Sequence, residues 1–130
     1  MMEKTLVQGD KSFVESNSPE NHYGVVFEDD GETGYFYGIQ TDPVSGEMQV
    51  LDALHIYEVP EDPPGRDLVK LLIIWSRDWL KCALVLDDHC HAVFDFEKHG
   101  GYNINEFPPP NAIWTRAGRK LTSGIINDFF

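Results

Sequence analysis

Short runs rich in hydrophobic, β-branched and aromatic residues recur along this chain, and turn-forming residues separate them. Such runs are typical of β-strands, in which successive side chains point to opposite faces. Three such runs in the first half predict three strands, at Tyr23–Glu28, Tyr35–Thr41 and Met48–Tyr57. Asp30-Gly31 and Ser45-Gly46 lie between the runs and supply the backbone conformations of tight turns. The first half therefore predicts an antiparallel meander.

The second half repeats this arrangement after a strong break. Val59–Asp67 contains three prolines and one glycine, which cannot continue a helix or a central strand. Three further runs then predict a second meander, at Leu68–Trp75, Trp79–Asp87 and Cys90–Glu97. The first of these runs has almost no polar residues, which predicts a strand that is buried on both faces.

The two ends of the chain are less regular. Leu6–Val14 is a weak strand interrupted by Gly9-Asp10, and Ala112–Thr115 predicts one more short strand. Between the second meander and that strand, paired glycines and three consecutive prolines predict an irregular arm. Thr122-Ser123 can cap a short C-terminal helix.

These elements predict a single domain over residues 1–130, because a chain of 130 residues is long enough for one ordinary domain. Its class is α+β and mostly β. Two antiparallel β-meanders, Tyr23–Tyr57 and Leu68–Phe96, form a curved sheet or a sandwich with a short C-terminal helix.

Charge narrows the classes of partner. The chain has 22 acidic residues against 10 Lys and Arg, so its formal net charge is −12. Such a charge repels phosphate backbones and anionic membrane surfaces, which disfavours nucleic-acid and membrane binding. A basic protein, a cation or a second copy of the chain remains open as a partner. Arg116, Arg119 and Lys120 form a basic cluster that we expect to make an internal or subunit contact.

Targeting signals are missing from the pattern. The first residues do not resemble a signal peptide, and no segment approaches the length of about 20 apolar residues that a membrane span needs. We therefore expect a cytoplasmic protein. In that compartment Cys82 and Cys90 are expected to be reduced thiols.

The segment DDHCHAVFDF, residues 87–96, concentrates metal-ligating side chains. If it is a strand, Cys90 and Phe94 face the core, whereas His89 and His91 share the other face. Two imidazoles on one face can bind Zn²⁺ if a third ligand joins them. The candidates for that ligand are Asp87, Asp95, His55 and His99. The competing interpretation is a solvated hairpin turn without a metal.

Other chemistry is not indicated, because the chain has no GxSxG, P-loop, GxGxxG or HExxH motif. We therefore expect a protein that is not an enzyme and needs no cofactor. The leading hypothesis is binding of a basic protein through the acidic hairpin tip and the irregular arm. The candidate binding residues are Asp29, Asp30, Tyr102, Phe107 and Pro109. The alternative is a metal-binding protein or metal-dependent enzyme that uses His89 and His91.

Three phrases carry a family resemblance: VVFEDDGETGYFYGIQ, QVLDALHIYEV and HAVFDFEKHGGYNINEFPPP. Together they resemble a small family of uncharacterised single-domain bacterial proteins, over Tyr23 to Trp114. The resemblance implies a bacterial cytoplasmic protein and assigns no catalytic residue. Small size and acidity are also similar to those of immunity proteins that neutralise basic toxin domains, which is an analogy of class only.

Overall fold

The computed structural model describes residues 2–60, 68–116 and 118–129. In this part of the chain there are nine strands and one helix. The strands are β1 (Met2–Val7), β2 (Ser12–Asn17), β3 (Tyr23–Asp29), β4 (Thr33–Thr41), β5 (Met48–Glu58), β6 (Leu68–Trp75), β7 (Lys81–Leu86), β8 (His89–Asp95) and β9 (Gly100–Asn103), and the helix is α1 (Ser123–Phe129). The break predicted over Val59–Asp67 lies outside the described residues from 61 onward.

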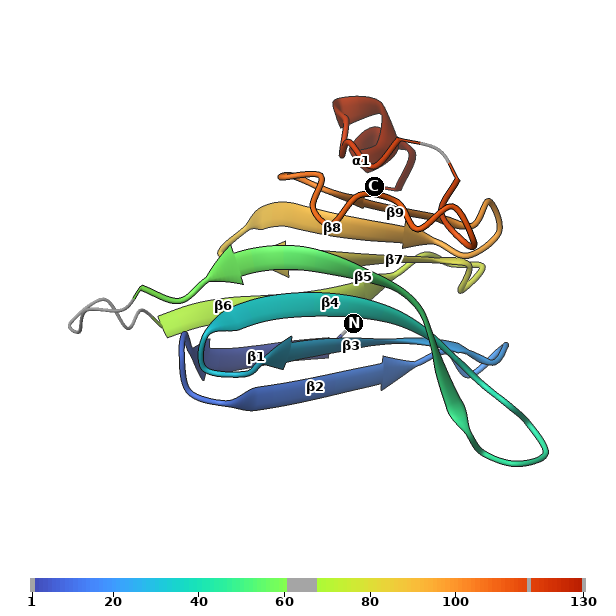
Figure 1. Ribbon diagram of the computed structural model, residues 1–130, viewed down its shortest axis with the longest axis horizontal. Helices are drawn as coiled ribbons and strands as arrows, with labels where there is room; N and C mark the ends of the chain where they lie inside the picture. The colour runs from blue at the N-terminus through green and yellow to red at the C-terminus, as the bar shows by residue number, and fades with distance from the viewer. Residues whose placement is uncertain (1, 61–67, 117, 130) are drawn as a thin grey trace.

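The strands form two antiparallel sheets. One has the order β1-β6-β7-β8-β9 and the other the order β2-β3-β4-β5. The second sheet lies in front of the first in Figure 1, so the fold has two layers. The two predicted meanders are confirmed as β3-β4-β5 and β6-β7-β8, and the mostly β class with a short C-terminal helix is confirmed as well.

A hydrophobic core fills the space between the layers. Its fully buried members come from both sheets, and the rings of Phe36 on β4 and Phe94 on β8 lie 5.3 Å apart. Gly38 permits this contact, because a Cβ atom at that position would lie 3.1 Å from the Phe94 ring. The alternation that predicted each strand is therefore satisfied by burial against the opposite sheet.

The N-terminal segment contains two strands where the sequence predicted one weak strand. β1 pairs with β6, and β2 pairs with β3 in the other sheet. Gly9, at φ +96°, lies in the turn between them. The interruption at Gly9-Asp10 is thus the place where the chain crosses from one sheet to the other.

Three details of the second half differ from the prediction. Ala112–Thr115 is not a strand, because the Asn111 side chain accepts hydrogen bonds from the backbone N–H groups of residues 113 to 115 and forms a turn. β9 was not predicted, since its Gly100-Gly101 pair suggested a loop. Gly101 lies against Phe94, and a Cβ atom there would approach the ring to 2.8 Å.

The third difference concerns β6, which was predicted to be buried on both faces. Val69, Leu71 and Ile73 are buried, but the opposite face is exposed at Leu68 and only half-buried at Leu72. The prediction was wrong because only one face of β6 packs into the core between the two sheets. The predicted cap is confirmed, since Thr122 Oγ1 accepts a hydrogen bond from the N–H of Ile125.

Candidate functional site

The outward face of the four-stranded sheet carries a row of large side chains that crosses all four strands. In the register of the sheet, Phe13 lies opposite Glu28, Glu28 opposite Tyr35, and Tyr35 opposite His55. Side chains of directly opposed residues project from the same face of a sheet. Four strands that are separated in the sequence therefore place three rings and one carboxylate in a line.

Phe107 extends this line beyond the edge of β5. Its ring meets the His55 ring edge to face, with the centroids 5.9 Å apart, and the Tyr35 ring meets His55 in the same way at 5.3 Å. The carbonyl of Phe107 accepts a hydrogen bond from the backbone N–H of His55. We call Phe13, Tyr35, His55 and Phe107, together with Glu28, the aromatic row.

The segment that carries Phe107 runs along β5 in the opposite direction. The Phe107 carbonyl accepts a hydrogen bond from the N–H of His55, and further along the segment the Asn111 side chain donates to the carbonyl of Leu51, which precedes His55 on β5. The Asn103 side chain also donates to the Phe107 carbonyl, at 2.9 Å. The predicted irregular arm is thus held in place, and it covers the β5 edge with prolines, which cannot continue a sheet.

Both ends of the aromatic row are open to solvent. Phe13 is 58% exposed and Phe107 is 53% exposed. Single exposed apolar side chains are common on protein surfaces. Exposed apolar side chains that belong to one surface feature are more typical of contact surfaces. Sequence reasoning identified Phe107, considered His55 only as a metal ligand, and missed Phe13.

Negative charge surrounds the row. Tyr37 stacks on Tyr35 with the ring centroids 6.0 Å apart, and its phenol has a raised pKa. Partial burial is the main cause, and the negative charges of Glu28 and Asp30 raise the pKa further. Glu28 and Asp30 therefore place negative charge near the Tyr37 ring.

The two predicted acidic binding residues, Asp29 and Asp30, have different surroundings in the structure. Asp29 is only 1% exposed, and its carboxylate accepts hydrogen bonds from the Tyr57 hydroxyl at 2.6 Å and from the N–H of Gly9 at 2.8 Å. Its position in the alternation with Val25 and Phe27 could have indicated this inward direction. Asp29 is therefore committed to internal contacts.

Asp30, by contrast, is exposed in the turn between β3 and β4. One of its oxygens accepts hydrogen bonds from the backbone N–H groups of Glu32 and Thr33, which lowers the pKa of its carboxyl. A surface hollow of about 370 Å³ lies beside it and is lined in part by Phe13 and Glu28. This hollow links the acidic turn to one end of the aromatic row.

Tyr102, Phe107 and Pro109 do not all lie on one side of the molecule. Pro109 is exposed on the arm, but Tyr102 lies opposite Val93 on the outward face of the other sheet. Burial, and then the charge of Asp95, raises the pKa of the Tyr102 phenol. The predicted arm surface is therefore divided between the two sides of the molecule.

The predicted histidine pair lies at the start of β8, where a bulge changes the alternation. Leu84 lies opposite Ala92, but Val85 lies opposite Cys90, so His91 is an extra residue in the strand. Cys90 consequently shares a face with Val85 and is not part of the core cluster. The prediction that Cys90 faces the core was wrong for this reason.

His89 is exposed and His91 is half-buried. Burial lowers the pKa of His91, and the nearby His89 lowers it further. Among residues 2–60, 68–116 and 118–129, no three His, Cys, Asp or Glu side chains converge in a way that could hold a metal ion. Metal binding through these two histidines stays a prediction.

The four predicted third ligands all have other contacts. Asp87 accepts from the N–H of Lys70, and Asp95 accepts from the N–H groups of Glu97 and Lys98. In the same way, His99 stacks on Trp114 and His55 Nδ1 lies 2.7 Å from the amide nitrogen of Asn105.

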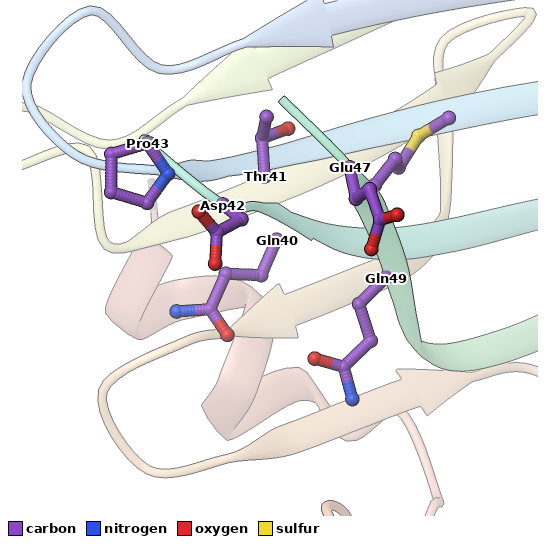
Figure 2. Close-up of a pocket in the computed structure, with 7 residues that line it drawn as sticks. Gln40, Thr41, Asp42, Pro43, Glu47 and Gln49 are labelled. Atoms are coloured by element: carbon purple, nitrogen blue, oxygen red, sulfur yellow. The ribbon is translucent and has the colours of Figure 1, made fainter. Parts of the chain in front are cut away.

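A second hollow, of about 520 Å³, lies at the turn end of the β4-β5 hairpin (Figure 2). Its polar side chains are Gln40, Thr41, Asp42, Glu47 and Gln49. Asp42 caps the turn by accepting hydrogen bonds from the N–H groups of Val44 and Ser45, which lower the pKa of its carboxyl. This carboxylate therefore stabilises the hairpin itself.

In the described part of the chain, no helix is long and apolar enough to span a membrane.

Comparisons with known proteins agree with the predicted resemblance. Residues 6–130 match the family DUF2251, which is described as an uncharacterised protein conserved in bacteria. An uncharacterised protein of Haemophilus influenzae is 40% identical over 97 residues, which cover 73% of this chain and 59% of that relative. The match thus spans less than two thirds of the relative's length. No solved structure matches the chain. The chain belongs to the DUF2251 family of uncharacterised bacterial proteins.

Proposed function

We propose that this protein is a non-catalytic module that binds a basic protein partner through the aromatic row. One observation carries the proposal: the sheet register aligns Phe13, Glu28, Tyr35 and His55 on one face, and Phe107 continues the line. The row is thus a property of the folded sheet and not of any single segment.

The chemistry of the row suits arginine and lysine side chains. A cation above an aromatic ring gains about 0.5 to 1 kcal/mol at an exposed site and about 2 kcal/mol when it is desolvated. Glu28 lies between Phe13 and Tyr35 and can pair with the same guanidinium group. Aromatic rings and carboxylates together therefore provide both contacts that an arginine makes at an interface.

Long-range electrostatics favour the same class of partner. The net charge of −12 attracts a basic protein before contact, which raises the association rate at low salt. A basic toxin domain would be one such partner, so an immunity-like role is one form of this function. A cytoplasmic location belongs to the same proposal.

A pull-down from a lysate of the source bacterium tests the proposal. The immobilised protein is compared with a double variant, Phe107→Ala with Glu28→Gln, because each substitution removes one kind of contact from the row. Val44→Ala is the matched control, since Val44 is a 95% exposed apolar residue on the β4-β5 hairpin, outside the row. We expect a basic protein to be retained by the wild type and by the control, and to be lost from the double variant. Equal retention by all three proteins would reject the aromatic row as the binding surface.

A further inference from the structure

The two sheets have four edge strands, and later segments of the chain bond to two of them. On β5, the N–H of His55 donates to Phe107. On β9, Asn103 donates to the carbonyl of Arg119 and accepts from the N–H of Leu121. Among the described residues, β1 pairs only with β6 and β2 pairs only with β3. In Figure 1, β2 forms the lower margin of the front sheet.

The two open edges differ in how well they are protected. β1 carries Lys4 between Met2 and Leu6, on the face that those two residues direct toward the core. An inward-pointing lysine on an edge strand discourages pairing with another chain. β2 has no lysine or proline, and it pairs with β3 over six residues without a bulge. β2 is therefore a regular strand edge that is available for pairing.

The outward-directed backbone groups of β2 can be identified. The N–H of Ser18 donates to the carbonyl of Tyr23 just beyond the end of β2, in the same register as the β2-β3 pairing. Hydrogen-bonded pairs alternate along an antiparallel ladder, so the even-numbered residues of β2 bond to β3. The N–H and C=O groups of Phe13, Glu15 and Asn17 consequently point away from the sheet.

Side chains and backbone on this edge belong to one surface. Phe13 is both an edge residue and the first ring of the aromatic row. Glu15 lies two residues further on the same face and adds a carboxylate. A strand paired with β2 would therefore place alternate side chains beside Phe13 and Glu15.

Charge decides which strand fits. A second copy of this chain would bring two molecules of net charge −12 together. Antiparallel pairing of β2 with itself that keeps both outward faces on one side would also place Glu15 opposite Glu15 or opposite Phe13 in the most central registers. An extended segment with arginine or lysine at alternate positions has the complementary charge.

We infer that an extended basic segment of the partner pairs with β2 as a fifth strand of this sheet. This inference rests on the proposed function and adds the mode of docking: backbone hydrogen bonds to Phe13, Glu15 and Asn17, with cationic side chains beside Phe13, at one end of the aromatic row, and beside Glu15.

The probe for this inference is a blocked synthetic peptide of alternating arginine and valine, about as long as β2. A matched peptide has the same sequence but N-methyl groups on the amides that would face β2, so it keeps its charge and loses those donors. Binding to the wild-type protein is measured by calorimetry. Glu15→Pro removes one outward N–H from β2, and Glu15→Ala is its control because it removes the same carboxylate and keeps the N–H.

We expect the plain peptide to bind and the methylated peptide to fail. We also expect Glu15→Pro to bind about two- to tenfold more weakly than Glu15→Ala, since Glu15→Pro removes one backbone hydrogen bond to the peptide. Circular dichroism checks that Glu15→Pro folds, and the methylated peptide remains decisive if it does not.

Each of the remaining outcomes rejects a named claim of the inference. If both peptides bind equally and Phe107→Ala weakens both, edge pairing is wrong and the proposed function stands. If neither peptide binds, edge pairing is wrong, and the pull-down decides the proposed function separately. If sedimentation shows a dimer that Glu15→Pro dissociates, the occupant of the edge is a second copy of the chain, and the inference is wrong.

Discussion

Arg119 and Asp52 form a buried ion pair that connects the C-terminal segment to β5. The Arg119 guanidinium donates to both carboxylate oxygens, at 3.0 and 3.1 Å, and Thr115 Oγ1 donates to the same carboxylate. Arg119 is only 2% exposed. The prediction of an internal contact from the basic cluster is confirmed for this residue, whereas Arg116 and Lys120 are exposed.

Replacement of Arg119 tests how much this ion pair contributes to the free energy of unfolding. Arg119→Met leaves the Asp52 carboxylate buried without its cation, so we expect the free energy of unfolding to fall by about 3 to 5 kcal/mol. The double variant with Asp52→Leu should lose less than the sum of the two single changes, because it leaves no unpaired charge. Urea denaturation measures the stability of Arg119→Met, of Asp52→Leu and of the double variant. Arg116→Ala, at an exposed residue, is the control. Additive losses would show that the two groups do not depend on each other.

Stability at alkaline pH should depend on Tyr57. Burial and the hydrogen bond to Asp29 raise the pKa of this phenol well above its ordinary value of 10.0. A raised folded-state pKa contributes stability that is fully present below the unfolded pKa and is lost as the pH rises above it. We therefore expect the wild type to lose stability above about pH 10 more steeply than Tyr57→Phe. Thermal melts across that range compare the two, with Tyr35→Phe as the control. Parallel curves for Tyr57→Phe and the wild type would contradict the shift.

The two cysteines should react very differently. Both are free thiols, as predicted, with Cys82 buried in β7 and Cys90 partly exposed in β8. Burial raises the pKa of both thiols and raises that of Cys82 the more strongly, so Cys82 has little thiolate and no access. We expect a thiol reagent to modify one cysteine in the native protein and two after denaturation. Cys90→Ser should abolish the native reaction, and a native reaction that survives in this variant would show that β7 opens.

Metal binding at His89 and His91 can be tested by whether the protein retains Zn²⁺ during dialysis. Zinc sites in proteins normally use three or four protein ligands, and the residues that the structure describes place no third His, Cys, Asp or Glu side chain beside these two imidazoles, which alone hold Zn²⁺ weakly. We therefore expect Zn²⁺ added to the untagged protein to be removed by dialysis, as measured by mass spectrometry of metals. Near-stoichiometric metal that is retained by the wild type and lost in both His89→Ala and His91→Ala would contradict this. It would also make the metal-dependent alternative the leading function.

Local alternation determined most strands of this protein. Val25 and Phe27 predicted a strand by their spacing alone, and Asp30-Gly31 predicted the turn that follows. These features depend on neighbours in the sequence, since a period of two or a turn residue acts over a few positions. The glycine pair of β9 was missed because its place in the sheet depends on contact with another strand, where Gly101 lies directly opposite Phe94.

Only the tertiary structure decided which side chains meet. Phe13, Tyr35, His55 and Phe107 lie in four separate segments, and the register between strands brings them into one row. A single bulge at His91 reversed the direction of Cys90. Register is set by long-range pairing and core packing, and a shift by one residue moves a side chain to the other face. The sequence by itself therefore determined the class of fold and the net charge of the chain, and the pairing of the strands decided which side chains share one surface.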